Sequence, residues 1–320
     1  LYKDFTEANG NFNVGRATFQ ESVKQVYDDL DTALVYLPMD FADVTKLSQV
    51  PVNLRSSDSV KTKSNYVTAF GKVDAQRASG RIVKFIKAQL ALLEASPAFN
   101  PTGDIALWTK AANYSAELLK GLTPSGVAGL NSQGHKFYLA ANVDAGISAE
   151  LLWVKSVITS PDLEKLHYPP SLFGAGLINP TQNLIDAFPM ANGYPIGQGP
   201  VVYDPTNPYV NRDPRLAAYI VTNGSTFATK VIKTGLGGGV NAKDSVAEST
   251  RTVYYMRKLV REDVPLDPSL ITGKKHRIVH MRYTEMFLNY AEAANEAFGP
   301  DADGGNGFTA RQVIRAIRNR

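Results

Sequence analysis

The chain has 320 residues, of which 44% are hydrophobic and 20% are charged, as is usual for globular proteins. Its net charge is only +4 and its longest basic run covers residues 274–277, so a nucleic-acid-binding stripe is not expected. The absence of cysteine excludes disulfides and thiolate metal sites, and no apolar run reaches the ~18 residues of a membrane-spanning helix.

An amphipathic helix is predicted first, from residue 18 to residue 37. Thr18 and Glu21 have the spacing of a capping box, in which each side chain accepts a hydrogen bond from the other residue's backbone N–H. Apolar residues follow at helical spacing until Pro38, which cannot continue a helix. Residues 39–65 are polar, and we expect them to be irregular.

Helical hairpins are predicted at both ends of the chain. Amphipathic helices within 74–100 and 105–126 are joined by a short Pro/Gly turn, as in one unit of a tetratricopeptide-like solenoid. We expect Trp108 in the core and a close approach of the two helices at small residues, which are Ala88, Ala91, Ala111 and Ala112. Residues 282–299 and 308–320 are predicted to form a second pair, whose last helix is still running at the final residue.

The middle of the chain is rich in Gly, Pro, Asn and Tyr. Short strands are predicted within 149–158, 215–227 and 252–260, and Asn223-Gly224 favours a hairpin. In 178–196 we expect Asn179 to cap a short helix that begins at Pro180, and Asn192-Gly193 to turn the chain.

These patterns predict three parts packed into one compact protein. The parts are an N-terminal helical scaffold (1–123), an irregular loop and strand region that recognises ligand (124–275) and a C-terminal helical hairpin (276–320). A long irregular region within a compact protein tends to carry binding function.

No motif predicts catalysis, a cofactor or a metal ion. His276 and His280 lack acidic residues at metal-ligand spacing, and "TGLGGGV" lacks the Lys and Ser/Thr of a phosphate-binding loop. "DADGGNG" has Asn306 and Gln312 where a calcium loop needs Gly and Glu. We therefore expect a protein that is not an enzyme and that uses no cofactor.

Aromatic side chains in the loops of the middle region are the candidate ligand contacts. Such rings can stack on sugars or hold peptide side chains, although a ring that anchors its own loop to the core is the commoner arrangement. The candidates are Tyr168, Phe173, Tyr194, Tyr203 and Tyr209.

Six stretches, in order, resemble motifs of the SusD/RagB family of nutrient-capturing outer-membrane lipoproteins of Bacteroidetes. They are "SVKQVYDDLDTALVYLP", "KAQLALLEASPAFN", "NPTQNLIDAFPMANGYPI", "NPYVNRDPRLAAYIVTNG", "TVYYMRK" and "MRYTEMFLNYAEAANEAFG". In "TVYYMRK", Val253 stands where the family commonly has Gly. Because family members begin with a lipidated Cys and extend further at both ends, we expect this chain to be a fragment of a longer protein.

The resemblance implies a mainly α fold, in which a tetratricopeptide-like helical-hairpin scaffold (α-α superhelix) carries a loop-rich middle region with a few short β-strands. It also implies capture of an oligosaccharide at the outer membrane, through a lipid anchor, and delivery to a TonB-dependent SusC-like transporter. A peptide-binding RagB-like subunit and a structural transporter lid without a ligand site are the alternatives. A hydrolase, the last alternative, would need two carboxylates about 5–10 Å apart in a cleft.

Overall fold

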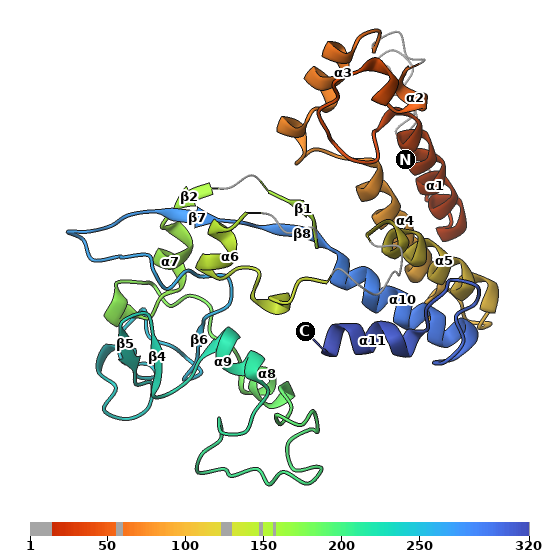
Figure 1. The fold of residues 1–320 in the computed structure, drawn as a ribbon. Coiled ribbons are helices and arrows are strands. Elements are labelled where there is room, and N and C mark those ends of the chain that lie inside the picture. The colour runs from red at the N-terminus through yellow and green to blue at the C-terminus, as the bar shows by residue number, and fades with distance from the viewer. Residues whose placement is uncertain (1–14, 56–59, 123–129, 147–149, 156–157, 320) are drawn as a thin grey trace. The chain divides into compact units, whose positions relative to one another are not determined.

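The computed structural model describes residues 15–55, 60–122, 130–146, 150–155 and 158–319 (Figure 1). The fold is mainly α-helical with short strands, as predicted. Its contacts divide the chain into two compact units. The first unit holds the described residues within Leu1–Leu130, Ala149–Trp153 and Met281–Asn319, and the second those within Asn131–Ser148 and Val154–His280.

The first unit is helical. Its long helices are α1 (Phe19–Tyr36), α4 (Gly80–Ala95), α5 (Ile105–Leu122), α10 (Tyr283–Phe298) and α11 (Ala310–Arg318). Shorter elements follow α1, namely η1 (Leu47–Gln49), α2 (Val52–Arg55), α3 (Lys63–Phe70) and η2 (Lys72–Asp74). The prediction of an irregular segment over 39–65 is therefore wrong in part, because α2 lies within it and α3 begins there. Across the described residues, no helix combines the length and hydrophobicity that a membrane crossing requires.

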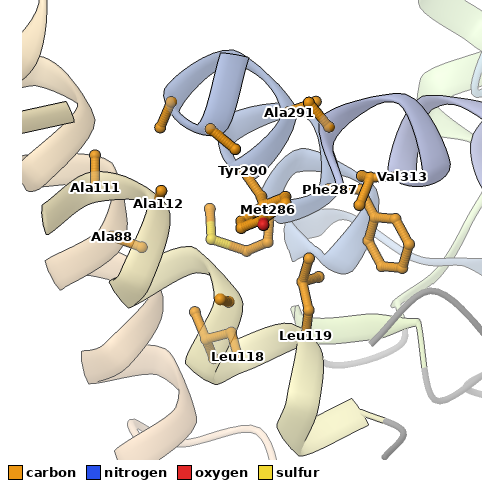
Figure 2. Packing of buried hydrophobic residues seen from close by; sticks show 14 of the residues in the cluster. Ala88, Ala111, Ala112, Leu118, Leu119, Met286, Phe287, Tyr290, Ala291 and Val313 are labelled. Atoms are coloured by element: carbon orange, nitrogen blue, oxygen red, sulfur yellow. The ribbon is translucent and has the colours of Figure 1, made fainter. Parts of the chain in front are cut away.

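Small residues allow the helices of the first unit to pack closely, as the sequence predicts. Helix α5 contacts both α4 and α10, and the four predicted alanines in α4 and α5 are fully buried. Figure 2 shows Met286 of α10 directed toward α5, with Tyr290 beside it. The Tyr290 hydroxyl donates to the Phe308 carbonyl at 2.6 Å, which holds the turn that leads into α11. Trp108 belongs to the same core.

The predicted capping box of α1 is confirmed. The Glu21 N–H donates to Thr18 Oγ1 at 3.2 Å, and the Thr18 N–H donates to Glu21 Oε2 at 2.8 Å. Lys87 of α4 links the three helices α1, α4 and α5. Its ammonium group pairs with Asp31 of α1 and lies 5.1 Å from the ring centroid of Tyr114 in α5.

The second unit is built from short elements and long loops. Its helices are η3 (Gly134–Lys136), α6 (Ala140–Asp144), α7 (Asp162–His167), η4 (Pro170–Leu172), α8 (Gln182–Ala187), α9 (Pro214–Tyr219) and η5 (Gly239–Asn241). Its strands are β2 (Ile158–Ser160), β3 (Ile220–Val221), β4 (Ser225–Phe227), β5 (Lys230–Ile232), β6 (Tyr255–Met256) and β7 (Lys274–His276). The boundary between the units falls within β1 (Leu151–Val154) and β8 (Val279–Arg282). Strands pair in twos, as β1 with β8, β2 with β7, β3 with β6 and β4 with β5.

Two strand predictions are wrong in this unit. Asn223 and Gly224 do form a turn, in which the Ser225 N–H donates to the Thr222 carbonyl at 3.1 Å, but β3 and β4 on either side pair with other strands. The first part of the predicted strand over 215–227 is helix α9. Pro214 and the N-cap Asp213, whose side chain accepts from the Arg215 N–H at 2.8 Å, begin this helix.

The cap of α8 is displaced by two residues from its predicted position. Thr181 is the N-cap, and its hydroxyl accepts from the Leu184 N–H at 3.3 Å. Asn179 instead bridges two segments, because it donates to the Gly176 carbonyl and accepts from the Arg251 N–H, both at 2.8 Å. The predicted turn at Gly193 is confirmed, since the Gly193 N–H donates to the Met190 carbonyl at 2.8 Å and φ at Gly193 is 88°.

Candidate functional site

The loop of residues 188–213, which we call the ring-bearing loop, connects α8 to α9 and carries three of the five candidate aromatic residues (Figure 1). Its two ends are joined at the base. Met190 and Arg212 form an isolated antiparallel bridge, and the Ala191 N–H donates to the Asn211 carbonyl at 2.8 Å. The base of the loop is therefore a defined backbone structure.

The side chain of Arg212 fastens this base to α8. It is 7% exposed, and its Nη2 donates to the carbonyls of Ile185 at 2.6 Å and Phe188 at 2.7 Å. Its Nη1 donates to the Pro208 carbonyl at 2.9 Å. The last carbonyls of a helix have no partner within the helix, so a guanidinium placed there satisfies them.

Helix α8 is in turn held by the core of the second unit. Ile185 is 1% exposed and packs with Leu216, Ile220 and Tyr254. The Tyr254 hydroxyl donates to the side chain of Gln182 at 2.7 Å. Arg212 thus connects the ring-bearing loop to an anchored helix.

Tyr194, Tyr203 and Tyr209 are partly exposed on this loop, and each ring has a fixed support. The Arg212 guanidinium lies 5.9 Å from the ring centroid of Tyr203. The Tyr209 ring meets the Tyr254 ring edge-on, with centroids 6.4 Å apart. Tyr194 is 50% exposed and packs on Gly199, where an added Cβ would come within 2.5 Å of the ring.

Two aliphatic side chains of the same loop are exposed as well. Val202 is 86% exposed and Val210 is 58% exposed. Val202 precedes Tyr203 and Val210 follows Tyr209 in the chain, so each exposed aliphatic side chain adjoins a candidate ring in sequence.

Phe173 lies in a different segment of the second unit. It is 55% exposed and follows η4 with a φ of 64°. The segment is held from beneath, since the Ser171 N–H donates to the buried Asn241 side chain at 3.0 Å and Lys230 donates to the Ser171 carbonyl. Phe173 is therefore a separate exposed ring on a supported turn.

Tyr168 is not available as a ligand contact, which corrects the sequence-based selection. Its side chain is 2% exposed, and its ring meets Phe227 edge-on at 5.0 Å within the core. The hydroxyl donates to the Arg261 carbonyl, and burial raises the pKa of that hydroxyl well above its usual value. The ring anchors its loop to the core.

His276, one of the two histidines considered as metal ligands, belongs to a buried polar network. It lies on strand β7, and its Nε2 is 2.8 Å from Oε1 of Glu164, which is fully buried in α7. The hydrogen bond that His276 makes to the Glu164 carboxylate raises the pKa of His276, although burial acts in the opposite direction. The Arg261 N–H donates to the same carboxylate oxygen at 2.8 Å. Within the described ranges, no group of three His, Asp or Glu residues is arranged to hold a metal ion.

Sequence reasoning missed Arg212 and Tyr254 as supports of the ring-bearing loop. The carbonyls that Arg212 binds are 24 and 27 residues away in the chain, and Tyr254 is 45 residues from Tyr209. No local spacing rule links residues so far apart. The only signal was that both residues lie within stretches that resemble family motifs.

Solved structures of known proteins share this fold. A SusD-like carbohydrate-binding protein of Bacteroides fragilis NCTC 9343 matches 95% of this chain and 57% of that chain, with a TM-score of 0.63 and 18% identity. A second SusD-like protein of the same strain matches 100% of this chain and 56% of that one, with a TM-score of 0.65 and 22% identity. The chain therefore spans little more than half the length of these proteins. No match is found among curated proteins.

The family-level comparison covers most of the second unit, from β1 onward, and the C-terminal helices. The model of the SusD family matches residues 148–320, which is more than half of the 320 residues. The matched range contains α8, the ring-bearing loop, Arg212 and helix α10. The chain belongs to the SusD family.

Proposed function

We propose that the protein captures an oligosaccharide at the cell surface and that the ring-bearing loop makes the contact. The observation that carries this proposal is the grouping of Tyr194, Tyr203 and Tyr209 on one loop whose base is fixed by Arg212. Membership of the SusD family, and the similarity to a SusD-like carbohydrate-binding protein of Bacteroides fragilis, support the choice of ligand class.

The energetics of such a surface agree with reversible capture. A sugar face that buries about 50 Å² on one aromatic ring gains about 1.2 kcal/mol at ~25 cal/mol per Å². Three rings and a few hydrogen bonds give roughly 4–6 kcal/mol, which corresponds to a Kd between about 1 mM and tens of micromolar. A ligand held this weakly can be passed on to a second protein.

Fixed support makes weak contacts effective. Each flexible side chain that must become ordered on binding subtracts about 0.5–1.5 kcal/mol from the affinity. The supports under all three tyrosines reduce this loss, because the rings are already packed on Arg212, Tyr254 and Gly199.

The full cellular role in this proposal is delivery. The protein is anchored by lipid to the outer membrane and hands its oligosaccharide to a TonB-dependent SusC-like transporter. It acts without catalysis and without a cofactor. The transporter would dock on a face other than the ring-bearing loop, which contacts the nutrient.

A peptide ligand is the second candidate, and one observation favours it. Val202 and Val210 are strongly exposed beside the tyrosines. Aliphatic side chains do not stack on sugars as rings do, but they can line pockets for apolar peptide side chains. A protein of this kind would be a RagB-like subunit of a peptide importer.

An array of oligosaccharides and peptides, followed by calorimetry on the bound compounds, tests the proposal. Tyr203→Ala and Tyr209→Ala are each expected to weaken oligosaccharide binding about five- to tenfold, since each removes about 1.2 kcal/mol of ring contact. Tyr36→Ala is the matched control, because Tyr36 is a 67% exposed tyrosine of the first unit. It should leave binding unchanged.

The outcomes separate the candidates. Unchanged affinity in both loop variants would refute the ring-bearing loop as the site. Binding of peptides alone would favour the RagB-like role, and binding of neither class would leave a structural transporter lid. Release of product from glycans or peptides by the purified protein would overturn the non-catalytic role.

A further inference from the structure

A concave site lies in the second unit and shares no lining residue with the ring-bearing loop. Its cavity of about 420 Å³ has three walls, and we call it the alanine-lined cavity. Its lining residues are Leu139, Ala140, Ala141, Ala228, Thr229, Val260, Arg261, Glu262 and Asp263. This volume lies in the lower part of the ~300–1,000 Å³ range of small-molecule sites, so the cavity suits a ligand of one or two rings.

The turn between β4 and β5 forms one wall and is held in an unusual conformation. Ala228 has a φ of 51°, which residues other than glycine seldom adopt. Its N–H donates to Oε2 of Glu262 at 2.8 Å, and Oε1 of the same carboxylate accepts from Arg257 Nε at 2.7 Å. Glu262 is therefore fixed in position while it lines the cavity.

Arg261 fixes a second carboxylate at the cavity. Its side chain is 2% exposed, and its Nε and Nη2 donate to the two oxygens of Asp263 at 2.9 Å and 2.7 Å. It also donates to both oxygens of Asp144, at 2.9 Å and 3.0 Å, and to the Lys275 carbonyl at 3.0 Å. These five bonds use all five N–H groups of the guanidinium. Arg261 thus positions acceptors but has no donor left for a ligand.

The cationic groups around the cavity outnumber the carboxylates by four to three. Three carboxylates lie here, on Glu262, Asp263 and Asp144. They are faced by the guanidinium groups of Arg257 and Arg261, and by the ammonium groups of Lys275 near Asp144 and Lys274 near Asp263. A cationic ligand therefore gains no net attraction.

The carboxylates nevertheless keep free acceptor capacity, since each ionised oxygen can accept more than one hydrogen bond. Asp263 is 45% exposed and Glu262 is 32% exposed, so solvent or a ligand reaches both side chains. Fixed acceptors beside an apolar wall match a neutral ligand that has hydroxyl donors on its edge and C–H groups on its face.

We propose that the alanine-lined cavity binds one neutral sugar unit, whose hydroxyl groups donate to Glu262 and Asp263 while its apolar face lies on Ala140, Ala141 and Val260. This inference rests on the proposed oligosaccharide-binding function and adds a second subsite to it. A pyranose carries the required arrangement, because its hydroxyl groups radiate from a ring with exposed C–H faces.

Nuclear magnetic resonance with ¹³C-methyl-labelled alanine tests the subsite on the intact 320-residue chain. Glucose, galactose and mannose are titrated one at a time, and at least one is expected to shift the methyl signals of Ala140, Ala141 and Ala228 to saturation in the millimolar range. Glucosamine, as the protonated amine, is the charge control and should bind no more tightly than its neutral counterpart.

Two filling variants and two matched controls make the assignment specific. Ala141→Trp and Thr229→Trp place a large ring in the cavity at exposed positions and should abolish the saturable shifts. Ala145→Trp lies just after α6, and Thr226→Trp lies on the exposed side of β4, so both should leave the shifts intact. Tighter binding of glucosamine would overturn the charge argument.

The experiments distinguish an error in the proposed subsite from an error in the proposed function. If both filling variants keep full sugar binding while Tyr203→Ala weakens it, the subsite is refuted and the ring-bearing loop stands. If no sugar shifts any cavity methyl signal, the subsite is likewise refuted. If neither set of variants affects oligosaccharide binding, both inferences fall.

Discussion

The guanidinium of Arg212 lies 5.9 Å from the ring centroid of Tyr203, and the same group donates to two carbonyls at the end of α8. One buried side chain therefore joins an exposed ring to a helix that is anchored in the core. Support of this kind explains how a loop of 26 residues, 188–213, can present rings in fixed positions.

Replacement of Arg212 by Lys should destabilise the second unit. Lys has a single nitrogen in place of Nη1 and Nη2, so it cannot reproduce the three bonds that the planar guanidinium makes to Ile185, Phe188 and Pro208. The Ile185 carbonyl would keep only its 3.3 Å bond from the Phe188 N–H, and a buried polar group that loses a hydrogen bond costs about 1–3 kcal/mol. We expect a loss of roughly 2–4 kcal/mol in the free energy of unfolding by urea denaturation. Hydrogen exchange of the Ala191 amide, at the base of the loop, should accelerate as well.

The control for Arg212 is its neighbour Arg215. Arg215→Lys changes a 50% exposed side chain that pairs with Asp213, so it should shift the free energy of unfolding by less than about 1 kcal/mol. Equal effects of the two substitutions would contradict the special role of Arg212.

Tyr168 and Tyr209 should respond differently to loss of their hydroxyl groups. Tyr168→Phe leaves the buried Arg261 carbonyl without its donor and should lower the free energy of unfolding by about 1–2 kcal/mol without altering ligand affinity. Tyr209→Phe removes only a 3.4 Å contact with Tyr254 and should change stability by less than about 0.5 kcal/mol. Calorimetric binding and urea denaturation on both variants check this, and a binding defect in Tyr168→Phe would oppose its assignment as an anchor.

The helical parts of the fold were predictable because their signals are local. Thr18 and Glu21 are three residues apart, and the buried alanines of α4 and α5 lie at helical spacing in the sequence. Pattern reasoning failed where the chain pairs over long distances. The strands β3 and β4 flank a good turn, yet β3 pairs with β6, which lies 34 residues later at Tyr255.

The candidate rings could not be sorted from the sequence for the same reason. Tyr168 and Tyr203 both lie in Pro-rich stretches, but only Tyr168 has a partner 93 residues away that draws it into the core. The surroundings of a loop residue are set by distant segments, and composition does not reveal them. The identity of the ligand is even harder to predict from the sequence, because it depends on the relative positions of several side chains.

The two histidines near Glu164 should give stability opposite dependences on pH. The hydrogen bond to the Glu164 carboxylate raises the pKa of His276 above its usual 6.5. The contribution of His276 to stability is therefore complete below about pH 6.5 and declines as pH rises through the raised pKa. Burial lowers the pKa of His167, so its contribution is present above about pH 6.5 and is lost as pH falls through the lowered pKa. Arg261 also faces this pair and opposes protonation of His276.

Thermal unfolding between about pH 5 and pH 9 measures these contributions. His276→Gln should lower Tm most at the acidic end, with a difference from the parent protein that shrinks toward the alkaline end. His167→Gln should instead reduce the fall in Tm below about pH 6. A constant difference across the range for His276→Gln would contradict the proposed coupling with Glu164.

Val253 occupies a position where glycine should be preferred. Its φ is 67°, and a β-branched residue in this region is strained. Val253→Gly and Val253→Ala both lose the side chain's packing, but Ala retains a strain of about 1 kcal/mol that Gly does not have. Urea denaturation should therefore find the Gly variant more stable than the Ala variant by about 1 kcal/mol. Within a strand the usual order is the reverse, with Ala more stable than Gly. The same pair at Val231, an exposed residue of β5, should show the usual order.

Because the helices of the first unit pack closely, replacement of its buried alanines by larger residues should destabilise the protein. Ala88 is fully buried in the cluster that joins α4, α5 and α10, as are Ala111 and Ala112, and protein interiors of this kind are close-packed. Ala88→Leu should therefore lower the free energy of unfolding by about 1–3 kcal/mol, because the helices must separate or the side chain must leave its preferred rotamer. Ala106→Leu, on the exposed side of α5, should change it by less than about 0.5 kcal/mol. A tolerated Leu at position 88 would mean that the helices are not held at the close distance that the alanines permit.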